Sequence, residues 1–567
     1  MLKKTILFLI ILTTGDIPVN AKMRTKSEMQ TIASRVISTE KAEATRSHNT
    51  LYECYSTPVL SMFTTIDGAF AVIARDDAYR AVLGYSTTKG NDIETLPDGL
   101  VWWMNAVTQA METKTANIMA SDVLRVKKSD FAEDIAPLIT STWNQGSPYN
   151  YMCPQMASKG NYPTGCVATA LSQIMRYHHY PEKGQDSYTY VFRPDDGTAY
   201  QLTANFGETI YDWANMLDSY KGGYTDVQRD AVALIMSHCG ISVNMSYNPS
   251  GSGAYSVEAT NALRTYFRYN ENVRLYRRDF YSSAQWMNIL YTELNNQRPV
   301  YYSGADPNSG GHAFVIDGYD AQGLVHVNWG WGGKSDGYFD IALLNPSGSK
   351  FTEGQEMIGN ICRPDIERPY FSQLGAAPIN INVYGSTTKR MSISASVYDV
   401  GADDFQGTIA AIIQNDRTTI VAKKQEGISL KASSQGFNKP VDVSLKSIDL
   451  TDIPDGTYRV YLGCRSEKDD AWQLVRSYKG EKNSCILTKS GSEYNIEDST
   501  DDMWTETTIA SKGDANGDGE VNAADIVEVA NYIMGSQSNN FMFDGADANG
   551  DRVVNAADIV KITNIAQ

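Results

Sequence analysis

The sequence predicts a multidomain chain: two α+β units, then an all-β sandwich of immunoglobulin-like size, then a small α-helical module. Its 567 residues are too many for one hydrophobic core, and 42% apolar with 20% charged residues is typical of globular domains. From about residue 378 to 488, short apolar–polar alternations indicate antiparallel strands. Near the C-terminus a 15-residue motif recurs at an offset of 33 residues, which indicates a repeated structural unit.

The N-terminus has the features of an export signal. Lys3 and Lys4 precede an apolar run at residues 6–12, and a small-residue cleavage site ends at Ala21. We therefore expect a signal peptide at residues 1–21 and a secreted, extracellular protein, either free or tethered to a cell surface or a complex. A retained N-terminal anchor is the alternative. No later run approaches the roughly 18 apolar residues of a transmembrane segment, and a net charge of −17 argues against nucleic acid as a partner.

Residues 22–134 form the first expected unit. Apolar runs at 52–63 and 68–73 predict short strands, and the pattern at 100–111 predicts an amphipathic helix. The basic stretch 125–130 then predicts an exposed linker that a protease can cut, although a solvated turn explains it equally well.

Cys166 opens a helical pattern in the second unit, residues 135–367. Apolar residues follow it at the spacing of a helix buried along one face: Val167, Ala170, Leu171, Ile174 and Met175. The N–H groups and the dipole at a helix N-terminus favour a thiolate, so Cys166 is a candidate nucleophile. A buried core cysteine is the competing interpretation. The chain has seven cysteines, so at least one is unpaired within an exported chain.

A thiolate nucleophile needs a base and a group that orients the base. His312 follows Cys166 by 146 residues, and Asn328 lies 16 residues further on. An Asn carbonyl can accept a hydrogen bond from one ring nitrogen and leave the other facing the sulfur. Trp329 is expected to shield that bond from water. A core histidine and a turn amide are the alternatives.

The two segments 310–320 and 323–333 read as a β-hairpin, and its register decides whether this pair can meet. With Phe314 opposite Asn328, the histidine and the asparagine lie on one face. With Val315 opposite Asn328 they lie on opposite faces, and a direct bond needs a bulge.

Gln145 lies in a polar loop, residues 142–150, that precedes the nucleophile helix. Its side-chain N–H and the backbone N–H of Cys166 are expected to stabilise an oxyanion. A loop amide bonded to the backbone is the alternative.

Residues 368–500 are the expected sandwich, with a spacer or docking role. Its predicted strands are 379–383, 391–397, 408–413, 457–462 and 472–475. Cys464 and Cys485 are candidates for a disulfide bridge, and residues 497–502 are expected to be an acidic linker.

The C-terminal repeat, residues 505–567, carries oxygen ligands at positions 1, 3, 5, 7, 9 and 12 of a calcium loop. Those of the first copy are Asp514, Asn516, Asp518, Glu520 (through its carbonyl), Asn522 and Asp525, and those of the second are Asp547, Asn549, Asp551, Val553 (through its carbonyl), Asn555 and Asp558. Position 12 is Asp in both copies rather than the bidentate Glu of an EF-hand, so coordination is expected to differ from that of an EF-hand. In the second copy Arg552 replaces the turn glycine Gly519, which bears on the affinity of that site and not on its existence. Hard oxygen donors favour Ca²⁺ over zinc. A solvated acidic surface is the alternative.

Two sequence blocks resemble the streptopain family of secreted cysteine peptidases. The first, residues 165–178, contains Gly-Cys-Val-Ala-Thr-Ala around Cys166; the second, residues 311–333, contains Gly-His-Ala-Phe-Val-Ile-Asp-Gly and His-Val-Asn-Trp-Gly-Trp-Gly-Gly. Residues 144–150 and 240–243 add shorter matches, and the runs 70–74 and 82–86 look like the family's propeptide.

This resemblance implies an α+β propeptide at residues 22–134, removed on activation, and a papain-like α+β peptidase domain at residues 135–367. It implies a dyad and its supporting groups: Cys166 and His312, with Gln145 at the oxyanion hole and Asn328 and Trp329 supporting the histidine. The family favours a hydrophobic residue just before the last acyl residue, and residues 249–254 with Ala305 are expected to line that pocket. The resemblance implies no cofactor for catalysis.

The C-terminal repeat is similar to a type I dockerin, which implies structural Ca²⁺ and a cohesin-type partner. The alanine pairs 523–524 and 556–557 stand at the expected recognition positions. The whole sequence thus predicts a secreted cysteine endopeptidase, made as a zymogen, that cleaves protein or peptide substrates and carries a calcium-dependent docking module. A non-catalytic adhesin or scaffold on the same fold, and acyl transfer to amines by the same dyad, are the alternatives.

Overall fold

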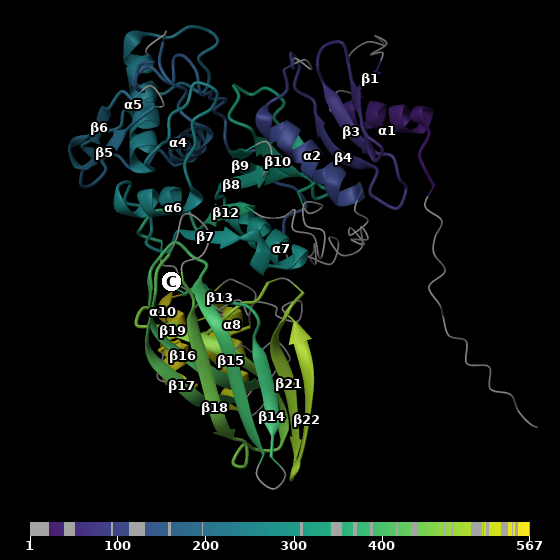
Figure 1. Ribbon diagram of the computed structural model, residues 1–567, viewed down its shortest axis with the longest axis vertical. Coiled ribbons are helices and arrows are strands. Elements are labelled where there is room, and N and C mark those ends of the chain that lie inside the picture. The colour runs from purple at the N-terminus through teal and green to yellow at the C-terminus, as the bar shows by residue number, and fades with distance from the viewer. Residues whose placement is uncertain are drawn as a thin grey trace, which may run out of the picture.

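The computed structural model of the chain (Figure 1) describes residues 22–38, 51–91, 95–112, 131–156, 160–194, 197–306, 310–341, 354–366, 371–385, 389–415, 418–432, 439–469, 471–478, 480–500, 513, 515–516, 521–534, 543–546, 548–549 and 554–565. The expected signal peptide at 1–21 and the cleavable linker at 125–130 lie outside these residues.

One antiparallel sheet of ten strands runs through the first two units. Its order is β1-β2-β3-β4-β11-β10-β9-β8-β12-β7. The strands are β1 (Tyr52–Ser56), β2 (Leu60–Thr64), β3 (Phe70–Ala74), β4 (Val82–Ser86), β7 (Arg274–Arg277), β8 (Val300–Asp306), β9 (Gly310–Tyr319), β10 (Val325–Asn328), β11 (Gly337–Phe339) and β12 (Glu356–Gly359). The run expected as one strand at 52–63 is therefore divided between β1 and β2.

The sheet passes from the first unit to the second where β4 pairs with β11. Tyr85 lies opposite Tyr338, and Gly84 opposite Phe339. A Cβ on Gly337 would lie only 2.2 Å from the carbonyl oxygen of Tyr85, so the close approach of these strands requires glycine there. The first unit is thus joined to the second by main-chain hydrogen bonds as well as by packing.

Two helices of the first unit lie on different parts of this sheet. Helix α1 (Lys26–Ser38) packs on β3, whereas α2 (Asp98–Glu112), which confirms the helix expected at 100–111, packs on β8 and β9 of the second unit. Buried Trp103 and Leu100 of α2 share a hydrophobic core with Phe314 and Trp329. The first unit therefore covers the part of the sheet that carries His312.

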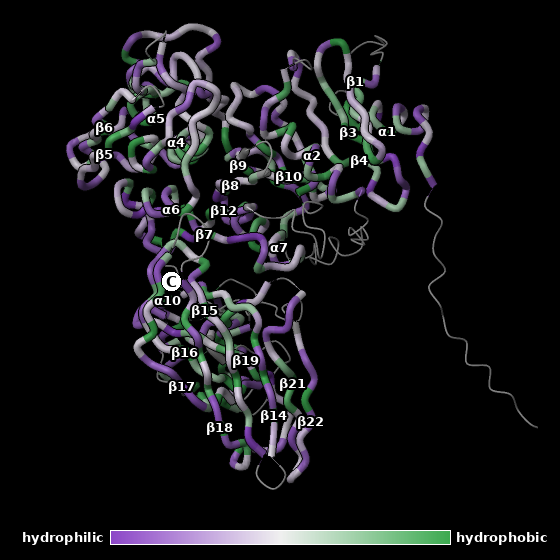
Figure 2. Tube along the Cα trace, viewed as in Figure 1, coloured by the Kyte–Doolittle hydropathy of each residue, from purple (hydrophilic) through white to green (hydrophobic). Residues whose placement is uncertain are grey.

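The rest of the second unit is mainly helical and encloses a core of its own. Its elements are α4 (Cys166–His178), α5 (Asp226–Ser242), α6 (Ser256–Thr265), α7 (Ser283–Asn295), the hairpin β5 (Tyr188–Phe192) and β6 (Tyr200–Ala204), and the 3₁₀ turns η2 (Phe206–Glu208), η3 (Trp213–Asn215) and η4 (Arg278–Phe280). Helix α4 packs on α5 and on β9, and Figure 2 shows hydrophobic residues along it. This packing brings the start of α4 to the strand that carries His312.

The third unit is a sandwich of two antiparallel sheets (Figure 1). One contains β13 (Leu374–Ala376), β14 (Asn380–Tyr384), β15 (Arg390–Asp399) and β18 (Val441–Asp449); the other contains β16 (Phe405–Asn415), β17 (Thr418–Leu430), β19 (Gly456–Ser466), β20 (Gln473–Leu474), β21 (Lys482–Ser490) and β22 (Glu493–Thr500). The predicted strands are present. The expectation of an acidic linker at 497–502 is wrong for residues 497–500, which belong to β22, and residues 501–502 lie outside the described residues. The expected bridge is also absent: Cys464 and Cys485 are both free, and Cys485 lies opposite Val460 instead.

The sandwich is docked on the second unit. Phe280 is fully buried, and its ring centroid lies 5.0 Å from that of Tyr478 and 6.2 Å from that of Tyr398. Arg264 of α6 forms an ion pair of 2.6 Å with Asp403. The sandwich is therefore attached through an apolar contact and an ion pair in addition to the chain connection.

The C-terminal module contains α8 (Ala523–Ile533), α9 (Phe543–Ala546) and α10 (Ala556–Ile565). Val529 of α8 and Ile562 of α10 are fully buried in its small core. Over the described part of the chain, the structure holds no helix long and apolar enough to span a bilayer.

Candidate active site

Cys166 is the first residue of α4, as the sequence predicts. Gly165 before it has a φ of 89°, and a Cβ there would lie 2.7 Å from the sulfur of Met245 and 2.9 Å from the carbonyl oxygen of Ser252. Only glycine fits this turn into the helix. No side chain caps the helix start, and Cys166 is partly exposed. The thiol therefore sits at an uncapped helix N-terminus and is partly open to solvent.

His312 lies on β9 with 6% of its surface exposed. Its Nε2 lies 2.9 Å from the carbonyl oxygen of Trp329. A carbonyl oxygen only accepts, so Nε2 carries the proton and donates it. The other nitrogen, Nδ1, is then left as the base toward Cys166.

Cys166 and His312 shift each other's pKa. Burial is the largest single effect on Cys166 and raises its pKa. The hydrogen bond and charge of His312, together with the N–H groups of Ala313 and Val167, outweigh burial, so the pKa of Cys166 lies below its ordinary value. Burial lowers the pKa of His312, but hydrogen bonding and charge interaction with Cys166 outweigh it and raise that pKa. The site therefore favours a thiolate beside an imidazolium.

Asn328 does not contact His312, which corrects the direct bond expected between them. The observed register places Val315 opposite Asn328. The hairpin has a bulge between His326 and Val327, which comes before Asn328 in β10. No bulge separates Asn328 from the part of β9 that carries His312, so the two side chains lie on opposite faces of the sheet. The acceptor that orients His312 is the backbone carbonyl of Trp329.

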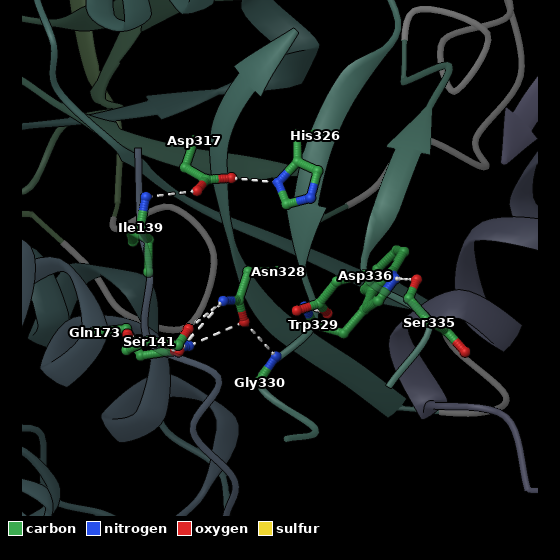
Figure 3. A network of polar contacts seen from close by, with 10 residues as sticks. All are labelled: Ile139, Ser141, Gln173, Asp317, His326, Asn328, Trp329, Gly330, Ser335 and Asp336. Atoms are coloured by element: carbon green, nitrogen blue, oxygen red, sulfur yellow. Dashed lines mark hydrogen bonds and ion pairs between the residues drawn. The ribbon is translucent and has the colours of Figure 1, made fainter. Parts of the chain in front are cut away.

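Gln173 is the partner of Asn328 (Figure 3), and the sequence analysis assigned no role to it. The Nε2 of Gln173 donates to Oδ1 of Asn328 at 3.1 Å, and Nδ2 of Asn328 donates to the carbonyl oxygen of Ser141 at 2.9 Å. Gln173 lies about two turns after Cys166 in α4 and is fully buried. Gln173 falls outside the apolar face that the pattern defines, and its burial was not predictable because the folded chain covers α4 on other sides too, from Val167 to Met175.

Asp336 is a second residue that the sequence analysis missed. Its carboxylate accepts the backbone N–H of Trp329 at 3.0 Å (Figure 3). Burial raises the pKa of Asp336 to about 7, although the hydrogen bond from the N–H of Trp329 and the charge of His326 both lower it. His326 is itself held by Asp317 at 2.6 Å. Asp336 therefore fixes the backbone of the residue whose carbonyl orients His312.

Gln145 lies beside the nucleophile helix, because its carbonyl oxygen accepts the N–H of Thr164 at 3.0 Å. The loop 249–254 is also adjacent: the hydroxyl of Ser252 donates to the carbonyl of Pro163 at 2.8 Å. Ala305 lies on β8 next to Gly311. Gln145 and Ser252 thus contact the segment that leads into Cys166, whereas Ala305 lies opposite Gly311, next to His312 in the chain.

The first unit contacts this site directly. A Cβ on Gly99 of α2 would lie 2.4 Å from Cδ2 of His312 and 2.5 Å from the ring of Trp329. The Oδ1 of Asn91 accepts the backbone N–H of Ser335 at 2.7 Å. The first unit thus packs on the histidine and holds the loop that follows Trp329.

Both copies of the C-terminal repeat have the same hydrogen bonds between the aspartate at position 12 and the backbone of the loop. The carboxylate of Asp525 accepts the N–H groups of Asn516 and Asn522 at 3.1 and 2.8 Å. The carboxylate of Asp558 accepts those of Asn549 and Asn555 at 3.1 and 2.9 Å. Both carboxylates are fully buried, which fits ligands of a cation at position 12 of each loop. The other expected ligands lie outside the described residues: Asp514, Asp518, Glu520, Asp547, Asp551 and Val553.

Comparison with known proteins agrees with this organisation. Residues 143–339 match the peptidase C10 family, residues 21–111 match the Spi protease inhibitor family, and residues 512–565 match the dockerin type I domain, a calcium-binding module. Streptopain of Streptococcus pyogenes is 37% identical over 295 residues, which are 49% of this chain and 73% of that protein. The thiol protease/hemagglutinin PrtT of Porphyromonas gingivalis is 37% identical over 290 residues, which are 33% of its length.

Among solved structures, a fragment of prointerpain A from Prevotella intermedia is similar with a TM-score of 0.50 and 40% identity. The match covers 55% of this chain and 99% of the fragment. This chain is a cysteine peptidase with a papain-like peptidase region. It belongs to the peptidase C10 family, the streptopain-like cysteine peptidases, and also carries a dockerin type I domain.

Proposed function

We propose that the chain is a secreted endopeptidase, made as a zymogen, that cleaves proteins through a thioester formed on Cys166. The observation that carries this proposal is the coupling of Cys166 with His312, which lowers the pKa of the thiol and raises the pKa of the imidazole. Both shifts favour the thiolate and the imidazolium that the reaction needs.

In the proposed reaction, the thiolate of Cys166 attacks the carbonyl carbon of the peptide bond and forms a carbon–sulfur bond. The C–N bond then breaks, and the proton of His312 passes to the leaving amine. Water gives a proton to His312 and attacks the thioester, which releases the acid and restores the thiolate. The N–H of Cys166 and the side-chain amide of Gln145 are the proposed donors to the oxyanion.

The pocket for the substrate side chain is proposed at residues 249–254 and Ala305. The loop 249–254 adjoins Gly165, since the carbonyl of Ser252 is among the atoms nearest to that glycine. Its position next to the nucleophile supports a role in selecting the residue near the cleaved bond.

The test is hydrolysis of a protein substrate such as casein under reducing conditions. We expect Cys166→Ala to abolish hydrolysis and His312→Ala to lower kcat by about 10²–10⁴-fold. Cys485→Ala, which removes a buried cysteine of the sandwich, is the matched control and should stay active. Hydrolysis that persists in Cys166→Ala would rule out the assignment, and incorporation of an added amine in place of hydrolysis would favour acyl transfer.

We also propose that the first unit keeps the enzyme inactive until it is removed. The contacts of Gly99 with His312 and Trp329 support this role, because a substrate cannot occupy the space that α2 fills. Residues 1–21 are the proposed signal peptide. The presence of both Cys166 and His312 speaks against a purely adhesive or scaffolding role.

The C-terminal module is proposed to bind Ca²⁺ structurally and to dock to a cohesin-type partner. The buried carboxylates Asp525 and Asp558 support this proposal. Titration calorimetry of the full chain should show calcium uptake that the double change Asp525→Ala and Asp558→Ala removes. Asp452→Ala, an exposed carboxylate of the sandwich, is the control. A wild-type chain that takes up no calcium would contradict the docking proposal.

A further inference from the structure

Asn328 is connected to His312 through a single peptide group. The carbonyl of Trp329 accepts Nε2–H of His312 at 2.9 Å, and the N–H of Gly330, which belongs to the same peptide group, donates to Oδ1 of Asn328 at 3.0 Å. A peptide group is planar, so fixing the direction of its N–H also fixes the direction of its C=O. Donation by the N–H also polarises the group and strengthens its carbonyl as an acceptor.

Gly330 allows the peptide group to take this orientation. Its φ is 71°, in the left-handed region that disfavours side chains. A Cβ there would also lie 3.1 Å from Cγ2 of Thr169 in α4. The peptide group that holds His312 therefore lies directly against the nucleophile helix.

Asn328 is in turn fixed by α4. Besides donating to Asn328, the fully buried Gln173 accepts the backbone N–H of Trp143 and the hydroxyl of Ser141, each at 3.1 Å. An unpaired amide at such a depth would be costly, so these bonds determine one orientation of both side chains. The helix that carries Cys166 thus also determines how Asn328 faces Gly330.

We propose that Gln173 and Asn328 are positioning residues that orient and polarise the Trp329–Gly330 peptide group, which in turn holds His312 toward Cys166. This inference rests on the proposed peptidase function and adds a mechanism for the orientation of its base. In this mechanism Asn328 acts on His312 through the backbone, and the buried side-chain amides of Gln173 and Asn328 together align the nucleophile with its base.

The test uses the full chain with Asn328→Ala, Gln173→Glu and Asn328→Asp, and measures kcat, KM and the pH dependence of Cys166 alkylation by iodoacetamide. We expect Asn328→Ala to lower kcat by about 10–100-fold with little change in KM, and to move the alkylation profile toward higher pH. Gln173→Glu replaces the donor to Asn328 by a buried carboxyl group and should act in the same direction, which provides a second variant if Asn328→Ala does not fold.

Asn328→Asp gives a signature that a purely structural role does not. A protonated carboxyl can still accept from Gly330 and donate to the carbonyl of Ser141, whereas an ionised one loses that donor. Activity relative to wild type should therefore be highest at acidic pH and fall as pH rises.

Asn270→Ala is the control, because Asn270 is a buried amide of the same unit whose bonds go to a loop outside the site. It should change stability but not the alkylation profile. The proposal is wrong if Asn328→Ala keeps the wild-type kcat and profile, or if Asn270→Ala changes them equally. Activity in Cys166→Ala would instead overturn the proposed function itself.

Discussion

The reactivity of Cys166 depends on two opposed effects on its pKa. Burial raises that pKa, whereas the hydrogen bond and charge of His312 lower it. Removal of His312 leaves burial in place, so the pKa of the thiol should rise above its ordinary value rather than return to it.

This balance predicts a pH shift in His312→Ala. A lowered pKa means that the thiolate is present at lower pH than in an ordinary cysteine, so wild-type Cys166 should be alkylated by iodoacetamide at lower pH than an ordinary cysteine. In His312→Ala the profile should move to higher pH. Rates followed at Cys166 by mass spectrometry check this, with Cys54 as an internal control, whose pKa burial raises to about 11. The same pH dependence of Cys166 alkylation in wild type and in His312→Ala would contradict the coupling of the two residues.

The sequence predicted the residue types of the site better than their contacts. Cys166 was recognisable because five apolar residues after it define a buried helix, and His312 because it opens a β-rich run. The bond that orients His312 was not predictable, because its acceptor is a backbone carbonyl, and every residue has one. Asp336 and Gln173 were missed for a related reason: only the folded chain brings them to Trp329 and Asn328.

Among the elements, α2 makes the closest contact between the first unit and the site. It carries glycine at position 99, the second residue of the helix, although alanine has the higher helix propensity. The neighbouring rings of His312 and Trp329 explain the choice, because they leave no room for a Cβ.

Gly99→Ala should therefore weaken the hold of the first unit on the peptidase, even though it favours the helix itself. We expect the full chain to shorten itself severalfold faster than wild type. Val101→Ala, which truncates an exposed side chain of the same helix, is the control and should leave the rate unchanged. The intensities of the full-length and shortened bands on a gel, followed over time, give the rate for each variant. Equal rates in Gly99→Ala and wild type would show that this contact does not restrain activation.

Strand patterns were informative where one face of a strand is buried and the other is not. The hairpin of β9 and β10 was predictable, but its register was not, because a bulge between His326 and Val327 shifts the pairing by one residue. The second half of the edge strand β22, residues 497–500, was mistaken for a linker because it is acidic and polar and does not continue the alternation of Tyr494 and Ile496.

For the whole molecule, the docked sandwich predicts coupled unfolding of the second and third units. Phe280 belongs to the second unit, yet its ring stacks on Tyr478 of the sandwich. Phe280→Ala should cost about 3–5 kcal/mol and separate the two unfolding transitions in calorimetry. Phe267→Ala, a truncation in the core of the second unit, should destabilise without separating them. A single unchanged transition in Phe280→Ala would contradict the coupling.

The proposed catalytic pair, the first unit that covers it and the proposed docking module lie in separate parts of one chain. The proposed calcium loops at residues 505–567 are remote in sequence from Cys166 and His312, so chelation should leave hydrolysis intact while it removes docking. We propose that Cys166 is the nucleophile that also frees the enzyme from its first unit.

Self-shortening of the purified full chain under reducing conditions tests this claim most directly. Intact-mass spectrometry over time should show wild type losing its N-terminal unit by cleavage near residues 120–135, whereas Cys166→Ala, incubated in parallel and free of other peptidases, stays full length. A Cys166→Ala chain that shortens itself at the wild-type rate and position would contradict the account.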